Sequence, residues 1–206
     1  MQACISVVDD DALVLRSLDR LLRSAGFAVR TFPSSQAFLA DPEADPGCVV
    51  IDLSLPGLGG LELQQALARS ADPRPVVFIT GRGDIASSVA AMKAGAIDFL
   101  VKPFDEQALL TAVRSAVEKD RAARGVREEL SLIVGRLAAL TPREREVLAG
   151  VVEGKLNKQI AAELGTAEKT VKVHRARMMR KMGVASLAGL VRAWTAIRHT
   201  DAASAP

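Results

Sequence analysis

Hydrophobic residues along the first 117 positions alternate between two patterns. Short, almost uninterrupted apolar runs rich in β-branched residues are typical of buried strands, and between them Leu13, Leu18 and Leu22 illustrate helical spacing. The predicted strands span residues 5–8, 29–32, 48–51, 76–79 and 99–101. Because strands that are apolar on both faces need helices on both sides, we predict an α/β fold with a doubly wound five-stranded parallel sheet.

Beyond residue 137 the spacing is helical throughout and predicts an all-α domain of four helices. Thr141 can cap the first helix, with Pro142 at the first helical position and Glu144 completing a capping box. The other expected caps are Asn157 and Ser186 at helix starts and Gly165 and Gly183 at helix ends. Residues 119–136, between the two patterns, are charged and predict a helical linker.

The distribution of charge supports this division into two domains. Residues 1–118 hold ten Lys and Arg against fifteen Asp and Glu, a net charge of −5, and the rest hold seventeen against nine, a net charge of +8. A basic domain is suited to a polyanion such as nucleic acid. We therefore expect an acidic domain over residues 1–118, a basic domain over residues 137–200 and a disordered tail over residues 201–206.

Composition excludes several classes of protein. Apolar residues make up 49% and charged residues 25% of the chain, and no apolar run approaches the roughly 20 residues that span a bilayer. In the N-terminal segment MQACISVVDDD, three acids follow a short apolar run, whereas a signal peptide would need a longer apolar stretch. We expect a cytoplasmic protein with no membrane partner, in which Cys4 and Cys48 are core residues and not a disulfide or metal site.

Five residues suited to chemistry stand at the carboxyl ends of predicted strands: Asp9 and Asp10 follow the first, Asp52 the third, Thr80 the fourth and Lys102 the fifth. These ends share one edge of a parallel sheet, so the five side chains should converge. Crowded carboxylates favour a hard divalent cation such as Mg²⁺, for which Mn²⁺ could substitute. The central carboxylate could then act as a nucleophile toward a phosphoryl group.

The acidic run at positions 9–11 also has a structural interpretation, because carboxylates favour helix N-termini. Asp11 fits the role of N-cap for the helix that follows. For an acidic pair after one strand we would favour that interpretation alone. Acids, a Thr and a Lys at successive strand ends favour a site instead.

Four blocks, VVDDD, IDLSLPGLGG, VFITG and DFLVKPF, resemble the signature motifs of response-regulator receiver domains of two-component signalling. The resemblance covers residues 1–120 and implies a flavodoxin-like fold in which Asp52 is phosphorylated. It implies a Mg²⁺ site formed by Asp10, Asp52, the backbone carbonyl of Ser54 and, through water, Asp9. It also implies switch or phosphoryl contacts from Thr80, Phe99 and Lys102. In this family the proline after the lysine, here Pro103, is frequently cis. Gly57 departs from the pattern, in a loop position that often holds Asp.

The resemblance also implies a mechanism. A phosphohistidine of a sensor histidine kinase donates to Asp52, and the receiver assists its own Mg²⁺-dependent phosphorylation and dephosphorylation, so it is not an enzyme in the usual sense. Thr80 moves toward the phosphoryl group and Phe99 turns inward, a local event that is read out elsewhere. Without the resemblance, Phe99 would be taken for a plain core aromatic.

The basic domain contains two predicted helices joined by a short turn after Gly165, the helix-turn-helix arrangement. Ile160 and Leu164 can face Val171 across the turn. The second helix is rich in Lys and Arg, and helical spacing gives it one face made of Lys169, Lys172, Val173 and Ala176. Charge alone would fit a solvated helix equally well, but the turn, the caps and the preceding acidic domain favour DNA binding.

The blocks LTPREREVL, GKLNKQIAAELG, EKTVKVHRARMMRKMG and SLAGLV resemble the LuxR-type helix-turn-helix over residues 140–191. This implies binding to double-stranded DNA at an inverted-repeat operator, with base contacts from Lys172 and Val173 and an apolar contact from Ala176 to a thymine methyl group. The other expected DNA contacts are Asn157, Lys158, Lys169, Thr170 and Arg177. The last helix resembles a dimerisation helix, with the stripe Leu187, Leu190, Val191 and Trp194, part of which must pack on the domain's own core.

A receiver, a linker and a LuxR-type domain in this order define the FixJ/NarL class of response regulators, and VFITG, AMKAGAIDFLVKPF and TPRERE are most similar to its FixJ-like branch. The class implies a transcription factor. We expect phosphorylation to switch homodimerisation and promoter binding, with activation of transcription and RNA polymerase as a further partner.

Two other functions can be weighed against the residues present. An aspartate-nucleophile phosphohydrolase of related fold needs a second catalytic Asp two residues after the first, and position 54 is Ser. A constitutive dimer controlled by a partner or ligand would have no use for the complete acidic site. The sequence leaves open whether the receiver occludes the recognition helix or only supplies a dimer interface.

Overall fold

The computed structural model describes residues 3–41, 47–70, 73–81 and 85–203. Contacts divide the chain into two compact units, Met1–Arg124 and Gly125–Pro206. The boundary lies inside the segment predicted to be a linker. Within the described ranges, no helix is both long and apolar enough to cross a membrane.

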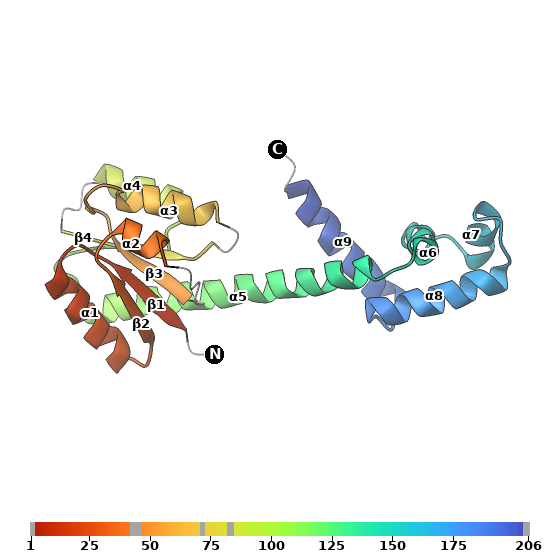
Figure 1. Ribbon diagram of the computed structural model, residues 1–206, viewed down its shortest axis with the longest axis horizontal. Helices are drawn as coiled ribbons and strands as arrows, with labels where there is room; N and C mark the ends of the chain where they lie inside the picture. Colours follow the sequence, from red (N-terminus) through yellow and green to blue (C-terminus); the bar gives the residue numbers. More distant parts are fainter. Residues whose placement is uncertain (1–2, 42–46, 71–72, 82–84, 204–206) are drawn as a thin grey trace. The chain divides into compact units, whose positions relative to one another are not determined.

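The first unit is built on a parallel five-stranded sheet with the order β2-β1-β3-β4-β5 (Figure 1). The strands are β1 (Cys4–Val8), β2 (Ala28–Phe32), β3 (Gly47–Asp52), β4 (Val76–Thr80) and β5 (Asp98–Val101). Every predicted strand is present and is extended by one or two residues. The predicted α/β doubly wound fold is therefore confirmed.

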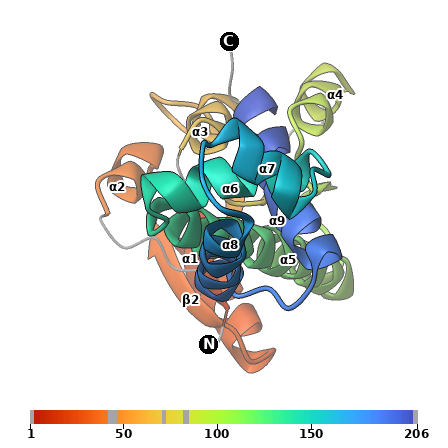
Figure 2. The ribbon, with the colours of Figure 1, turned by 90° about the vertical axis from the view of Figure 1, so that its right-hand side faces the viewer.

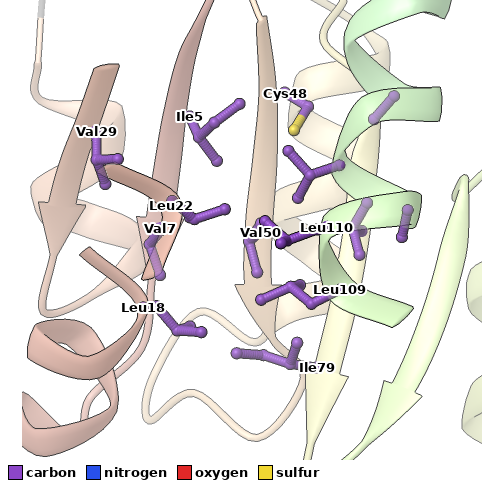
Figure 3. Packing of buried hydrophobic residues seen from close by; sticks show 14 residues of the cluster. Ile5, Val7, Leu18, Leu22, Val29, Cys48, Val50, Ile79, Leu109 and Leu110 are labelled. Carbon is purple, nitrogen blue, oxygen red and sulfur yellow. The ribbon is translucent and has the colours of Figure 1, made fainter. Parts of the chain in front are cut away.

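Helices cover both faces of this sheet. The helix α1 (Ala12–Ser24) and the first part of α5 (Glu106–Ala138) cover one face, where Val50 packs in a core with Leu22 and Leu109 (Figure 3). The helices α2 (Ser35–Leu39), α3 (Gly60–Ala68) and α4 (Ile85–Lys93) cover the other face, where Ile51 packs. Neighbouring strand residues point to opposite faces, so burial of both explains the uninterrupted apolar runs.

The two cysteines are buried, as expected for core residues, and are not joined to each other by a disulfide. Cys4 lies opposite Gly47 in the β1–β3 ladder, one position away from Cys48, so the two thiols point to opposite faces of the sheet. Burial raises the pKa of the Cys48 thiol to about 12. This thiol therefore stays protonated and unreactive at neutral pH.

The helix α5 continues beyond the expected end of the first domain. Asp120 is only 3% exposed, and its carboxylate accepts hydrogen bonds from the Gly47 N–H at 2.9 Å and from Arg124 Nε at 2.8 Å. This contact was not predicted, because a stretch as charged as KDRAAR is typical of a solvated helix surface. Asp120 ties α5 to the start of β3.

The second unit contains four further helices, α6 (Pro142–Val152), α7 (Asn157–Glu163), α8 (Glu168–Met182) and α9 (Leu187–Ala203), as predicted (Figure 2). Ile160 and Val171 are buried together with Met178 in one core. Ile133 of α5 belongs to the same core, so the last turns of that helix are part of this unit. The helix α9 runs to Ala203, inside the expected tail, and residues 204–206 lie outside the described part of the chain.

Most of the predicted caps are present in the second unit. Thr141 and Glu144 form the capping box, Gly183 ends α8 in the left-handed conformation with φ +66°, and Ser186 accepts from the Gly189 N–H. The prediction for Asn157 was wrong: Leu156 occupies the N-cap position of α7. Asn157 Oδ1 instead accepts a hydrogen bond from Arg175 Nη1 at 2.9 Å, a partner that sequence spacing does not reveal.

Candidate functional site

Three carboxylates meet at the carboxyl edge of the sheet. Asp9, Asp10 and Asp52 each place one oxygen within 4.8 Å of the others. Asp9 and Asp52 are buried and Asp10 is exposed, which leaves the cluster open on one side. Backbone donors orient the buried pair, because the Asp11 N–H donates to Asp9 Oδ1 at 2.9 Å and the Ser54 N–H donates to Asp52 Oδ1 at 3.0 Å.

Lys102 joins the two buried carboxylates. Its ammonium donates to Asp9 Oδ2 at 2.7 Å and to Asp52 Oδ2 at 2.9 Å. Burial raises the pKa of the Asp9 carboxyl, an effect that the hydrogen bonds from Lys102 and Asp11 only partly offset. Burial also lowers the pKa of Lys102, but the bonds to Asp9 and Asp52 outweigh it and the net shift is upward. Lys102 therefore remains a cation at physiological pH.

Two further predicted residues lie on the strands beside the carboxylates. Thr80 ends β4 and is fully buried, and its carbonyl accepts from the Lys102 N–H at 2.7 Å. Phe99 on β5 is half-buried, with its ring centroid 6.4 Å from that of Phe78. The peptide bond between Lys102 and Pro103 is cis. The sheet edge thus brings the predicted acidic and ammonium side chains together, with Thr80 at the end of the neighbouring strand β4 and Phe99 one strand further, on β5.

Glycines shape the loop that follows Asp52. Gly57 has φ +77°, a conformation that L side chains rarely adopt, which gives a physical reason for Gly at this position. A Cβ atom on Gly60 would lie 2.6 Å from the Asp52 carbonyl oxygen. The start of α3 can therefore approach the backbone of Asp52 only because position 60 has no side chain.

The donor set at this edge fits a hard divalent cation. All three clustered side chains offer carboxylate oxygen, the ligand that Mg²⁺ prefers, and the exposed position of Asp10 leaves room for water and for a phosphoryl oxygen. The buried charge of Asp9 and Asp52 is only partly compensated by one ammonium. A divalent cation would complete the compensation.

A second candidate surface lies on the second unit. The predicted DNA contacts on α8 are all exposed: Lys169, Thr170, Lys172, Val173, Ala176 and Arg177. Val171, on the opposite side of the same helix, is fully buried. Val173 exposes 43% of its surface although it is apolar, and Lys172 pairs with Glu168 at 2.9 Å. The helix α8 therefore presents an exposed basic face that includes the apolar Val173, a combination that suits contacts with both phosphates and base edges.

Comparison with known proteins identifies the family of each domain. Residues 5–114 match the response regulator receiver domain family, and residues 138–194 match the luxR family of bacterial regulatory proteins. The chain belongs to the FixJ-like response regulators. It combines a receiver domain with a LuxR-type DNA-binding domain, as transcriptional regulators of this family do.

Similarity to known proteins extends over most of the chain. The response regulator is 46% identical to Nodulation protein W of Bradyrhizobium diazoefficiens over 93% of this chain and 85% of the relative. It is 44% identical to the transcriptional regulatory protein FixJ of the same organism, over 91% and 92% of the two chains. The structure of the response regulator StyR covers 95% of this chain and 99% of its own, with 47% identity and a TM-score of 0.86.

The expected dimerisation stripe of the response regulator divides into two parts. Leu190 is fully buried in the core of the second unit, and Trp194 is half-buried against that core. Leu187 and Val191 remain 43% and 39% exposed. Leu190 is therefore corrected from a dimer contact to a core residue, because α9 packs it inside its own unit.

Three arginines of the response regulator have roles that were not predicted. Each donates to a carbonyl at the C-terminal end of a helix: Arg145 Nη2 to Ala138 of α5 at 3.0 Å, Arg143 Nη2 to Leu164 after α7 at 2.7 Å, and Arg136 Nη1 to Met182 of α8 at 3.2 Å. Such carbonyls have no partner within their own helix. The donors lie 7 to 46 positions away in sequence, so no local motif predicts them.

Proposed function

We propose that this response regulator accepts a phosphoryl group on Asp52 from a sensor histidine kinase. The observation that carries the proposal is the bridge formed by Lys102 between Asp9 and Asp52. It places a cation where phosphoryl oxygens would come to lie, beside a carboxylate held in place by the Ser54 N–H.

Mg²⁺ would be held by Asp10 and Asp52, by Asp9 through water and by the backbone carbonyl of Ser54, and Mn²⁺ could replace it. When bound, it would neutralise the negative charge shared by the carboxylates and the incoming phosphoryl group. The protein's own contribution is to bury Asp9 and Asp52 and to fix the Asp52 nucleophile through the Ser54 N–H.

In the transfer, a carboxylate oxygen of Asp52 attacks phosphorus, and the bond from phosphorus to the donor histidine nitrogen breaks. Lys102 turns from the carboxylates toward the new phosphoryl oxygens. The Thr80 hydroxyl moves to donate to one of them, and Phe99 turns into the space that Thr80 leaves. The same residues assist the later hydrolysis of the acyl phosphate.

The phosphorylated protein would dimerise and bind an inverted repeat in double-stranded DNA, acting in the cytoplasm where the kinase domain and promoters are found. Lys172, Val173 and Ala176 would read bases, and the remaining contacts would position the module on phosphates: Asn157, Lys158, Lys169, Thr170 and Arg177. The exposed Leu187 and Val191, with the accessible part of Trp194, would contribute to the dimer. Activation of transcription through RNA polymerase would follow.

Phosphorylation by acetyl phosphate with Mg²⁺ tests the proposal directly. Wild type should gain one phosphoryl group in intact mass spectrometry and Asp52→Asn none. Asp11→Asn is a matched control, because Asp11 caps α1 and lies next to the cluster without belonging to it. Labelling that survives in Asp52→Asn would overturn the assignment, as would equal loss in Asp11→Asn.

A second measurement tests whether phosphorylation controls dimerisation and DNA binding. Phosphorylated wild type should sediment as a dimer and retard promoter DNA at lower concentration than the untreated protein. Asp52→Asn should show neither response to acetyl phosphate. If the untreated and treated proteins were both dimeric and bound DNA equally, the constitutive-dimer alternative would replace this proposal.

A further inference from the structure

Two cationic side chains, Arg136 and Lys181, connect the C-terminal end of the recognition helix α8 to neighbouring segments. Arg136 Nη1, from the last turn of α5, donates to the carbonyl of Met182 at 3.2 Å. Lys181, on α8 itself, donates to the Ala139 carbonyl at 3.2 Å and to Glu144 Oε2 at 2.7 Å. One end of α8 is thus fixed to α5, to the residue after it and to α6.

A cation suits this place for two reasons. The last carbonyls of a helix have no partners within the helix, and the partial charge at that end is negative. The backbone also makes room, because a Cβ atom on Gly183 would lie 2.7 Å from Arg136 Nη1. Gly183 therefore both ends α8 in the left-handed conformation and leaves space for the guanidinium.

Arg136 differs from the other two arginines that cap helix ends. Arg145 and Arg143, both on α6, bind carbonyls at the ends of α5 and α7. Arg136 instead links α8 to α5, the uninterrupted helix that also supplies Leu109 and Val113 to the receiver core. Position 136 is therefore where the helix leaving the receiver is bonded to the helix that carries Lys172 and Val173.

We propose that Arg136 is a positioning residue for DNA recognition. By fixing the C-terminal end of α8, it sets how deeply and in which direction the exposed face of that helix enters the major groove. The inference rests on the proposed base reading by Lys172 and Val173. Loss of Arg136 should therefore reduce discrimination between DNA sequences more than it reduces general attraction to DNA.

The test uses the full-length protein, phosphorylated with acetyl phosphate and Mg²⁺. Two duplexes serve as probes: one selected by the wild type from a random-sequence pool, and one of scrambled sequence. The variants are Arg136→Met, which keeps the aliphatic stem, Arg136→Lys, which keeps a donor, and Arg145→Met as control. The control removes the same charge from a comparable carbonyl contact that does not involve α8.

Arg136→Met should weaken binding to the selected duplex about tenfold, comparable to one mismatched base pair, and binding to the scrambled duplex less than about twofold. Arg136→Lys should recover most of the loss, and Arg145→Met should stay within about twofold of wild type on both duplexes. The dependence of affinity on salt should not change, because Arg136 contacts a carbonyl and not a phosphate.

Three results would overturn the inference. Equal behaviour of Arg136→Met and Arg145→Met would show that the contact to Met182 does not matter. Equal loss on both duplexes with a shallower salt dependence would make Arg136 a phosphate contact. Failure of the wild type to select any sequence would remove the proposed base reading as well, so the two failures are distinguishable. Emission from Trp194, the single Trp of the chain, reports whether each variant is folded. Should Arg136→Met unfold, Arg136→Gln against Arg145→Gln carries the comparison, because both remove the guanidinium and keep a polar side chain.

Discussion

The ammonium of Lys102 lies 2.9 Å from Oδ2 of Asp52, a residue fifty positions earlier in the chain. The pair exists because β3 and β5 both end at the same edge of the sheet, with β4 between them. The phosphoacceptor of the proposed reaction is therefore paired with a cation before any phosphoryl group arrives. One consequence of this pairing can be measured directly.

Replacing Lys102 by Met should slow phosphorylation of Asp52 by acetyl phosphate by about a hundredfold, the effect of removing one preorganised donor at a developing charge. The rate is measured by separation of phosphorylated protein on a phosphate-affinity gel. Lys93→Met is the control, since it removes the same charge from the last turn of α4. Equal rates in the two variants would contradict a role for Lys102 in the transfer.

Gly60→Ala should destabilise the receiver unit by about 1–3 kcal/mol, because the added Cβ meets the Asp52 carbonyl oxygen and this backbone has no flexible end that can move aside. Urea unfolding followed by circular dichroism gives the free energy of unfolding. Gly81→Ala is the matched control, because a Cβ there meets nothing within 4 Å. A Gly60→Ala variant as stable as this control would show that the loop after Asp52 relaxes freely.

Two exposed residues on α8 should differ in how they affect DNA binding. Val173→Ala should change the base preference in the selected sequence with little change in salt dependence, since an apolar side chain reads base edges. Arg177→Ala should weaken binding to all sequences alike and reduce the salt slope by about one. Binding titrations at several salt concentrations separate the two. The reverse pattern would mean that base and phosphate contacts have been assigned to the wrong residues.

Glu144 should make the stability of the DNA-binding unit depend on pH. The hydrogen bond from Lys181, followed by that from the Thr141 N–H, lowers the pKa of Glu144 from 4.5 to about 2. A lowered pKa stabilises the folded state fully above pH 4.5, and the contribution is lost as pH falls from 4.5 toward 2. Glu144→Gln should therefore lower the urea concentration at the unfolding midpoint at pH 7. Below pH 4.5 the difference from wild type should become progressively smaller.

Trp194 fluorescence follows this unfolding selectively, because the chain has one Trp and no Tyr. Glu146→Gln is the control, since Glu146 pairs with Arg143 on an exposed surface and surface pairs contribute little. If the difference between wild type and Glu144→Gln were the same at pH 7 and pH 3, the ionised carboxylate would not be the source of the stability.

The site at the sheet edge could be predicted from sequence because topology alone brings it together. Once β1, β3, β4 and β5 are recognised as parallel strands, Asp9, Asp52, Thr80 and Lys102 must share one edge whatever the details of packing. The helix caps at Thr141 and Gly183 were equally predictable, because each depends on residues close in sequence.

Features that depend on distant partners could not be predicted. The amphipathic stripe of α9 contains both Leu190 and Val191, and only its packing against α6 decides that the first is core and the second is exposed. The burial of Asp120 depends on a backbone N–H at Gly47, and Arg136 depends on a carbonyl at Met182. Charged side chains at such positions look the same in sequence as those on a solvated helix.

The helix α5 contributes Val113 to one hydrophobic core and Ile133 to the other. This sharing limits how such a gene can be recombined. A junction placed at position 137 would separate Ile133 from the core of the DNA-binding unit, and Arg136 from the Met182 carbonyl, with which they pack in this chain. A crossover near Gly125 leaves Asp120 with the receiver and Ile133 with the DNA-binding domain, so exchange of output domains between relatives should succeed within those few helical residues.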